Sequence, residues 1–288
     1  MTKVMGITTE DIKKLRENTG AGMMDCKRAL EETKGDMKAA VEYLRKKGAA
    51  VAVKRADRAA KEGMIVTRVS ADRKTGVVVE VNCETDFVGR SDDFVAFANA
   101  VAAAVEHSRP ASIEALLGSV GTDGKLLSAL LNDLLAKVGE KIEVRRMKLL
   151  QSPDGMISNY THMGSKIGVL VELRGLTQEQ SERTTGRDIA MQIAAMNPLV
   201  VTREKVDSST VDREIEIYKT QAKNEGKPEQ ILEKIAKGRL EKFFQEMALV
   251  EQMYIKDQGK TVNEVLHEAG PAVSVVQFVR YHLGEETT

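Results

Sequence analysis

Apolar residues in the first part of the chain recur at helical spacing and are interrupted by glycine. Ile12 and Leu15 lie on one face of a first predicted helix, which a pair of glycines then ends. Two further runs follow, MDCKRALEET and an amphipathic stretch that stops at Gly48. Residues 1–48 are therefore predicted to form a three-helix domain, and the alanine- and charge-rich residues 49–62 a partly helical linker.

The middle of the chain contains a duplication. Matching runs begin at Gly63 and Gly76 in the first copy and at Gly155 and Gly168 in the second, each 92 residues further on. Each copy has the pattern of two β-branched strands, a loop and an alanine-rich helix whose small face can approach a sheet closely. We predict two ββα repeats with antiparallel sheets, over residues 63–150 and 151–205.

Beyond the second copy, apolar residues step alternately by four and three positions. The stripe runs through Ala236, Leu240, Phe243, Met247, Val250 and Tyr254. This spacing predicts a coiled coil, and the break NEGKP makes it a protruding antiparallel hairpin over residues 206–258. Residues 259–288 are predicted as a C-terminal module, in which a short helix precedes a strand that returns to the core sheet. The fold class is α+β.

Charge and cysteine content exclude several classes of protein. The 288 residues include 43 basic and 43 acidic side chains, so a chain-wide cationic surface for nucleic acid is excluded. Cys26 and Cys83 form neither a CxxC motif nor an even-numbered framework, which argues against disulfides and thiolate zinc sites. No apolar run approaches the roughly 20 residues of a membrane span. We expect a cytoplasmic protein without membrane contact.

Motifs for catalysis or nucleotide binding are incomplete. The run that starts at Gly121 resembles part of a phosphate loop, but Leu126 replaces the magnesium-binding hydroxyl residue. The histidines share no metal-ligand spacing, and no nucleophile motif occurs. We therefore expect no cofactor, no metal and no enzymatic activity.

The loop after the second strand of the first repeat, CETDFVGRSDD, places a carboxylate beside a large aromatic ring. A strand end is a rigid platform, and the equivalent loop of the second copy, residues 175–187, has neither an aromatic residue nor this acidic cluster near its strand. One interpretation is that this loop has a specific function. The other is that Phe87 and Val88 tuck under the sheet while Thr85 or Asp86 caps a turn. The residues alone leave both open.

Two other segments have unusual chemistry. In LRENTGAGMMDCKRAL, Met23 and Met24 either plug the core of the small domain, the more usual case, or form an adaptable contact surface. In YTHMGSKIG, a polar turn between two strands presents His162 at its tip, and it can equally be an ordinary hairpin turn.

Together, LRENTGAGMMDCKRAL and EVNCETDFVGR closely resemble the two signature stretches of the translation elongation factor Ts family, and the order of parts matches as well. One departure is Gly89, where the family commonly has Ser or Ala. The resemblance implies a UBA-like N-terminal domain, a duplicated core and a coiled-coil hairpin. It also implies a guanine nucleotide exchange factor that promotes GDP release from elongation factor Tu and is not itself an enzyme.

The resemblance further implies roles for individual residues. Phe87 would wedge into an apolar pocket of the partner's GTPase domain, Asp86 would disturb the magnesium environment, and Thr85 and Val88 would hold the pair in position. Further partner contacts are implied for Arg16, Met23, Met24, Lys27, Val138, His162 and Ile255, with His162 meeting the domain farthest from the nucleotide. The hairpin near Ile255 is a contact or a site of self-association, which leaves open a homodimer within a 2:2 complex.

Two competing functions remain. Residues 45–61 contain seven basic side chains and one acidic, which suits an RNA-binding module, although the chain is neutral overall and no aromatic platform accompanies them. An enzyme site built from Glu80, Asp86 and Glu172 is weaker still, because the two glutamates are repeat equivalents with an expected structural role. We therefore expect no direct contact with nucleic acid.

Overall fold

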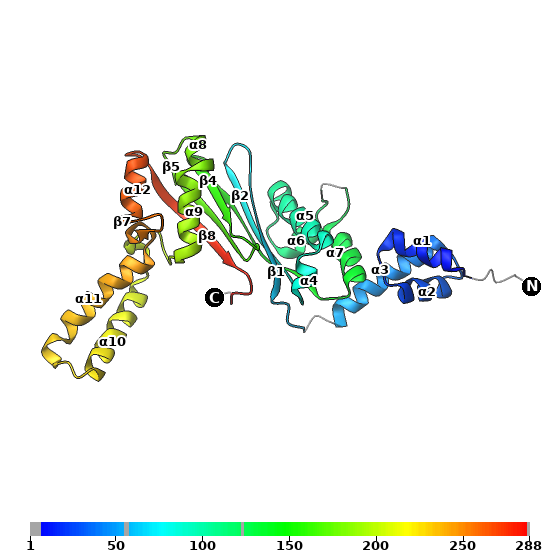
Figure 1. The fold of residues 1–288 in the computed structure, drawn as a ribbon, viewed down its shortest axis with the longest axis horizontal. Helices are drawn as coiled ribbons and strands as arrows, with labels where there is room; N and C mark the ends of the chain where they lie inside the picture. The colour runs from blue at the N-terminus through cyan, green and yellow to red at the C-terminus, as the bar shows by residue number, and fades with distance from the viewer. Residues whose placement is uncertain (1–6, 55–57, 122–123, 287–288) are drawn as a thin grey trace, which may run out of the picture.

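The computed structural model describes residues 7–54, 58–121 and 124–286, and it is elongated (Figure 1). A three-helix module lies at one end, two three-stranded antiparallel sheets with their helices form the middle, and a helical hairpin lies at the other end. This mixture of helices and antiparallel sheets confirms the α+β class. Among the helices of these ranges, none has both the length and the apolar character that crossing a membrane requires.

The N-terminal module consists of α1 (Thr9–Thr19), α2 (Met23–Glu32) and α3 (Met37–Lys54). Leu15, Cys26 and Leu30 are fully buried between the helices. The helix α3 continues through Gly48, where the sequence predicted its end. A helical glycine costs only about 1 kcal/mol relative to alanine, and the alanine-rich segment that follows favours the helix enough to absorb this cost. Residues 49–54 of the predicted partly helical linker are thus the last part of α3, whereas residues 55–57 lie outside the described residues and Glu62 begins β1.

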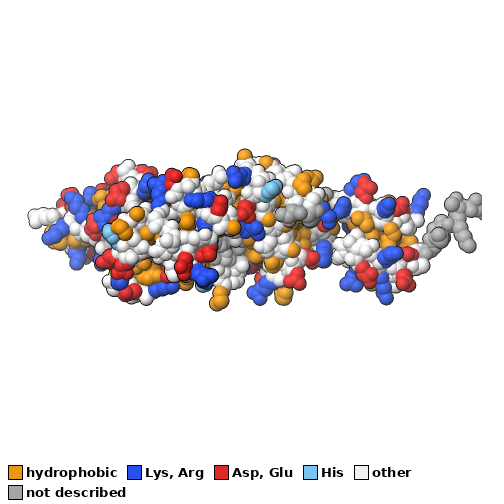
Figure 2. All heavy atoms as spheres, turned by 90° about the horizontal axis from the view of Figure 1, so that it is seen from above, with side chains coloured by type: hydrophobic (Ala, Val, Ile, Leu, Met, Phe, Trp, Pro, Cys, Tyr) orange, Lys and Arg blue, Asp and Glu red, His pale blue; other side chains and the backbone are white. Residues whose placement is uncertain are grey.

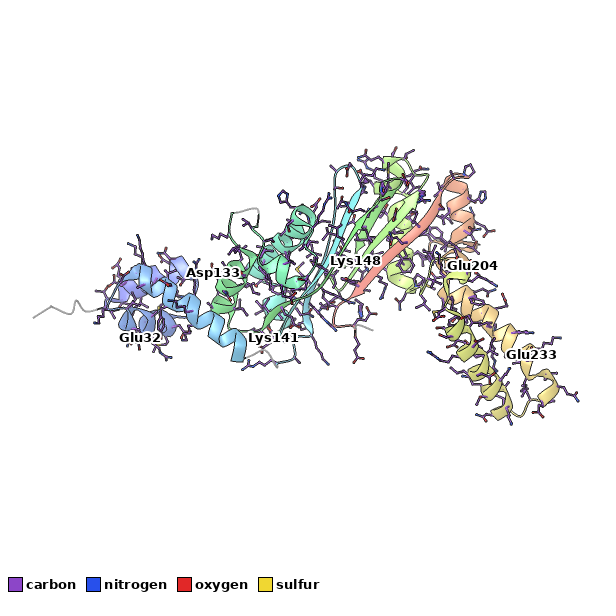
Figure 3. All side chains as sticks on the ribbon, turned by 180° about the vertical axis from the view of Figure 1, so that it is seen from behind. Glu32, Asp133, Lys141, Lys148, Glu204 and Glu233 are labelled. Atoms are coloured by element: carbon purple, nitrogen blue, oxygen red, sulfur yellow. The ribbon has the colours of Figure 1, made fainter. Side chains whose placement is uncertain are left out.

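The module attaches to the core through α3, which packs along α7 (Leu127–Val138). At this contact the Arg45 guanidinium donates to both oxygens of Asp133, at 2.9 and 3.2 Å, and Figure 3 labels Asp133 at the junction. Between the module and the core helices lies a groove of about 500 Å³ with Leu44 and Phe97 among its lining residues. The two bodies therefore meet mainly through this helix pair, with Gly20 also against the Lys137 side chain, and leave a groove beside it.

The first repeat builds a sheet in the order β1-β2-β3. Its strands are β1 (Glu62–Val69), β2 (Thr75–Cys83) and β3 (Ile142–Gln151), and its helices are α4 (Asp86–Gly89), α5 (Asp92–Ser108), α6 (Ile113–Leu117) and α7. The helices α5, α6 and α7 cover one face, where Val79, Val81 and Phe94 are fully buried.

The second repeat builds the sheet β4-β5-β8. Its elements are β4 (Met156–Thr161), β5 (Ile167–Arg174), β8 (Ser274–His282), α8 (Gln178–Arg183), α9 (Thr185–Met196) and α12 (Val262–Ala269). Met64 pairs with Val81 in the first sheet, and the residues 92 positions later, Met156 and Leu173, pair in the second. Even the irregularity in register after Glu80 recurs at the equivalent position of β5, so the duplication seen in the sequence is a structural one.

The two sheets pack on each other through the faces that the helices leave uncovered. Ile65 and Val78 from the first sheet meet Ile157 and Leu170 from the second, and all four are fully buried. The two repeats thus share a third core between the sheets. The duplicated halves are therefore joined face to face by a continuous apolar contact.

The helical hairpin is inserted within the second repeat, between α9 and α12. It consists of α10 (Ser208–Asn224) and α11 (Glu229–Met247), flanked by short segments η1 (Arg203–Lys205), η2 (Leu249–Glu251), β6 (Met253–Tyr254) and β7 (Asp257–Thr261). The two long helices pack side by side (Figure 1). Residues 259–286 supply α12 and β8 and so complete the second sheet, as the predicted returning strand requires.

The predicted helical stripe is wrong beyond Met247. Leu249 is fully buried in the core of the second repeat, and the helix ends before it, at Met247. Val250 therefore lies in η2 and Tyr254 in β6. Ile255 therefore lies in the turn between β6 and β7 and not on the hairpin.

Candidate functional site

The turn that follows β2 is organised around Thr85. Its backbone is extended (φ −124°, ψ 154°), and its hydroxyl oxygen accepts the backbone N–H of Val88 at 3.4 Å, which starts the single helical turn α4. The thiol of Cys83 donates to the Thr85 carbonyl at 3.1 Å. Burial is the main reason why the pKa of this thiol rises to about 12. The thiol therefore acts as a neutral donor that supports the turn.

Phe87 and Val88 point in different directions from this turn. The Phe87 residue is 84% exposed, whereas Val88 packs against the core of the first repeat. The interpretation in which both tuck under the sheet is therefore wrong for the aromatic ring and right for the valine. Phe87 thus presents a large apolar ring to solvent on a short, anchored turn.

The Asp86 carboxylate lies beside the exposed ring and is itself about half exposed. Its Oδ2 atom is 3.2 Å from the guanidinium of Arg90, four residues later, whose side chain is 81% exposed. An ion pair this exposed contributes little stability, so Asp86 can exchange Arg90 for another cationic group at small cost. The aromatic ring and the carboxylate are thus presented together at the end of a buried strand.

The sequence interpretation missed two residues that hold this turn. Glu140, 55 residues away, accepts the Thr85 backbone N–H at 3.0 Å and the Thr85 hydroxyl at 2.7 Å. Glu84 accepts the backbone N–H of Lys141 at 2.6 Å. The one signal in the sequence is that Glu84 follows one predicted strand and Glu140 precedes another, each within a few residues of the strand end.

His162 lies at the exposed tip between β4 and β5, as the sequence predicted, and Met163 beside it is 87% exposed. The Nδ1 atom of His162 is 3.0 Å from the hydroxyl oxygen of Tyr160. Residues next to this tip contact the start of β1, because Lys166 pairs with Glu62. The tip and the Thr85 turn therefore converge on the same end of β1.

Close packing joins the Thr85 turn to β1. A Cβ atom at Gly89 would lie 3.3 Å from Cys83 Sγ and 3.4 Å from Gly63 Cα. Gly89 thus lies directly against the backbone of β1.

The four predicted contact residues of the N-terminal module are exposed. Met23 is 41% and Met24 66% exposed, so the interpretation of these methionines as core plugs is wrong. Arg16 is exposed as well, and Lys27 pairs only loosely with Glu31, at 3.9 Å. These residues lie on α1 and α2, a separate body from the Thr85 turn (Figure 1).

Val138 and Ile255 are each half-buried. Val138 ends α7 and packs against the core of the first repeat. The Ile255 backbone N–H donates to Gln192 Oε1 at 2.8 Å. Both residues therefore contribute to packing within the chain and offer only part of their surface to a partner.

The basic segment over residues 45–61 is largely neutralised where its side chains are described. Its ion pairs are Arg45 with Asp133, Lys46 with Glu42, Lys47 with Asp25 and Arg58 with Glu84. The side chains of residues 48–57 lie outside the described part of the structure. Figure 2 shows acidic and basic groups interspersed along the molecule, an arrangement unlike a nucleic-acid-binding stripe.

The carboxylates proposed for an enzyme site do not come together. Glu80 is fully buried and bonded to Arg145 and Arg146, whereas Asp86 is half exposed beyond the end of the same strand. Within the residues that the structure describes, no group of three or more His, Cys, Asp or Glu side chains could hold a metal ion.

Comparison with known proteins agrees with the two signature stretches. The family model described as elongation factor TS matches residues 84–285. A protein of Prosthecochloris aestuarii named elongation factor Ts is 49% identical over 286 residues, which cover 96% of this chain and 99% of the relative. The proteins of that name from Chloroherpeton thalassium and Chlorobium limicola are 46% and 47% identical, each over 97% of this chain and 99% of their own length. The chain therefore belongs to the elongation factor Ts family.

Proposed function

We propose that this protein is a guanine nucleotide exchange factor in translation elongation, which binds elongation factor Tu in its GDP form and promotes GDP release. The observation that carries this proposal is the 84% exposure of Phe87, next to the half-exposed Asp86, on a turn anchored to a rigid sheet. The name shared by the relatives supports the assignment to elongation.

The chemical problem in nucleotide exchange is release. A GTPase holds GDP through a phosphate-binding loop at a helix N-terminus and through a magnesium ion that bridges oxygens, so dissociation is slow. Phe87 would enter an apolar pocket of the GTPase domain, and burial of a phenylalanine contributes about 1.5–3 kcal/mol. Asp86 would approach the magnesium environment and disturb its coordination. The burial energy offsets the nucleotide contacts that are lost.

Coupling between two binding sites is reciprocal. If binding of this chain weakens GDP binding, GDP must weaken binding of this chain by the same factor. Either nucleotide therefore displaces the factor, which accelerates exchange without choosing its direction.

Contacts outside the Thr85 turn would supply the rest of the affinity. On this proposal Arg16, Met23, Met24 and Lys27 dock on the GTPase domain, and His162 meets the domain farthest from the nucleotide. Val138 and Ile255 contribute with the part of their surface that is accessible. Thr85 and Val88 hold the turn and do not meet the nucleotide.

The test is the rate at which elongation factor Tu releases a fluorescent GDP analogue when this chain is added. Replacing the ring by Phe87→Ala should lower the stimulated rate by about 10-fold to 100-fold, the equivalent of the lost burial energy. Asp86→Ala should lower it as well. Neither variant should change the melting temperature, because both side chains are exposed. The matched control is Leu199→Ala, an apolar residue that is 57% exposed far from the turn in sequence. Unchanged release with both residues of the turn replaced would refute the proposal.

A further inference from the structure

We propose that Glu140 is a positioning residue for the exchange site: together with Glu84 it extends the β2–β3 ladder by side-chain hydrogen bonds and so sets the direction in which Asp86 and Phe87 leave the sheet. The effect on GDP release rests on the proposed function. The side-chain hydrogen bonds that extend the β2–β3 ladder rest on geometry alone.

The extension begins where the backbone ladder stops. The last backbone pair joins Cys83 and Ile142, so continued pairing would place Glu84 opposite Lys141 and Thr85 opposite Glu140. Side chains replace the backbone at both steps. The Glu84 carboxylate accepts the Lys141 N–H at 2.6 Å, and the Glu140 carboxylate accepts the Thr85 N–H at 3.0 Å. Figure 3 labels Lys141 beside this sheet edge.

The bonds from Glu140 determine orientation as well as position. Its two oxygens accept from two atoms of Thr85, the backbone nitrogen and, at 2.7 Å, the hydroxyl oxygen. A carboxylate acceptor makes each bond stronger than a neutral one, and two bonds to one residue fix its rotation. Because the hydroxyl proton points to Glu140, the lone pairs of that oxygen are available to the Val88 N–H, which starts α4. The direction of α4, and with it the direction of the Phe87 ring, follows from this chain of bonds.

In the second repeat, the equivalent threonine N–H is bonded by a residue nearby in sequence. The comparison shows that the first repeat differs in using a distant residue. The residue 92 positions after Thr85 is Thr177, which also caps a helix. Its backbone N–H is accepted by Gln180 of its own first turn, at 2.9 Å, in a capping box. The repeat equivalent of Gln180 is Val88, which has no acceptor and packs into the core instead. Glu140 therefore supplies, from a distant part of the chain, the acceptor that Gln180 supplies locally in the second repeat.

The first experiment is hydrogen exchange of the free chain. Replacing Glu140→Gln removes one of the two carboxylate acceptors, and Glu140→Ala removes both. We expect the Thr85 amide to exchange at least 10-fold faster in the alanine variant, with a smaller increase in the glutamine variant. Protection in β2 and the melting temperature should stay the same. The control is Glu106→Gln, which removes a carboxylate bonded to Arg68 on another part of the same repeat.

The second experiment follows release of fluorescent GDP from elongation factor Tu at increasing concentrations of each variant. If the Thr85 turn is formed but points in another direction, the maximal rate of GDP release should fall by about 10-fold. The half-saturating concentration should stay nearly constant, since the other contact surfaces are intact. A general loss of fold would instead raise the half-saturating concentration.

The outcomes separate the two proposals. Unchanged exchange at the Thr85 amide, or faster exchange spread over the whole core with a lower melting temperature, would overturn the positioning role of Glu140. Faster exchange confined to the turn, together with a maximal rate equal to that of the unmodified chain, would overturn it as well. If the unmodified chain does not stimulate GDP release, the proposed function fails, while the hydrogen-exchange result still decides the ladder extension.

Discussion

Gly76 and Ile157 lie against each other across the two sheets, so closely that a Cβ atom on the glycine would come within 2.6 Å of Ile157 Cγ2. Their counterparts 92 residues away make the reciprocal contact: a Cβ atom on Gly168 would lie 2.4 Å from Ile65 Cγ2. In each repeat the glycine has no side chain, and the isoleucine of the other repeat fills the space that a side chain would occupy. The duplication is therefore also a contact between its two copies.

Alanine at Gly76 or at Gly168 should separate the sheets. Overpacking of a filled core costs about 1–3 kcal/mol, so each variant should lower the free energy of unfolding by that amount in urea denaturation. Gly238→Ala is the control, since nothing lies within 4 Å of a Cβ atom there and a helical alanine is favoured over glycine. Equal stability of all three variants would show that the sheets can shift to admit a methyl group.

Glu80 and Glu172 occupy equivalent positions but should differ in cost when replaced by glutamine. Glu80 is fully buried and accepts from the guanidinium of Arg146 at 2.6 Å and of Arg145 at 3.3 Å. Breaking a buried ion pair costs about 3 kcal/mol or more, because the remaining charge is left without its partner. Glu172 accepts at 2.7 Å from a neutral amide, that of Gln277, so Glu172→Gln should cost less than about 1 kcal/mol.

The comparison of these two variants is made by chemical denaturation at neutral pH. Each is the control for the other, because residue type, repeat position and burial match. A Glu80→Gln variant as stable as Glu172→Gln would mean that the two arginines find enough water or other acceptors to replace the carboxylate.

Cys83 should make the stability of the chain depend on alkaline pH. Burial raises the pKa of this thiol from its ordinary value of 9.0 to about 12, so the folded chain holds the proton more tightly than the unfolded chain. The contribution of the thiol to stability is therefore complete below pH 9.0 and is lost progressively as pH rises toward 12.

This pH dependence is measured as the difference in free energy of unfolding between the unmodified chain and a Cys83→Ala variant, which cancels the titration of lysines and tyrosines. The difference should stay constant below pH 9.0 and shrink as the pH rises toward 12. In parallel, thiol reagents at pH 8 should label Cys83 and the buried Cys26 only after unfolding. Rapid labelling of the native chain would contradict the protonated, enclosed state of Cys83.

His162→Ala should weaken the complex with elongation factor Tu and leave the fold intact. The imidazole is exposed and contacts Tyr160 at 3.0 Å, so its loss removes no core packing. We expect a dissociation constant raised about 10-fold in titration calorimetry, the equivalent of one lost polar contact at an interface. His267→Ala, on α12, is the control. An unaltered dissociation constant would count against a contact role for the β4–β5 tip.

Local periodicity was sufficient to predict most elements. The strands around Gly76 and Gly168, the helices of the N-terminal module and the hairpin at the NEGKP break lie where the hydrophobic spacing predicted, except that α3 continues past Gly48 and α11 ends at Met247. These features are local, because the spacing of apolar residues within a helix or strand depends only on its own geometry. Residues that pair between strands in the first repeat also pair in the second, 92 positions later.

Contacts between distant segments decided the rest. The sequence left open whether Phe87 and Val88 both tuck under the sheet or the loop serves a function, and only packing against the first core shows that Val88 turns inward and Phe87 does not. The end of α11 at Met247 depends on the burial of Leu249 in the core of the second repeat. The bonds from Glu140 to Thr85 span 55 residues, and no local pattern encodes a partner at that separation. The sequence by itself thus determined the parts and their repetition, while the tertiary structure decided which side chains of the exposed turn remain available to another molecule.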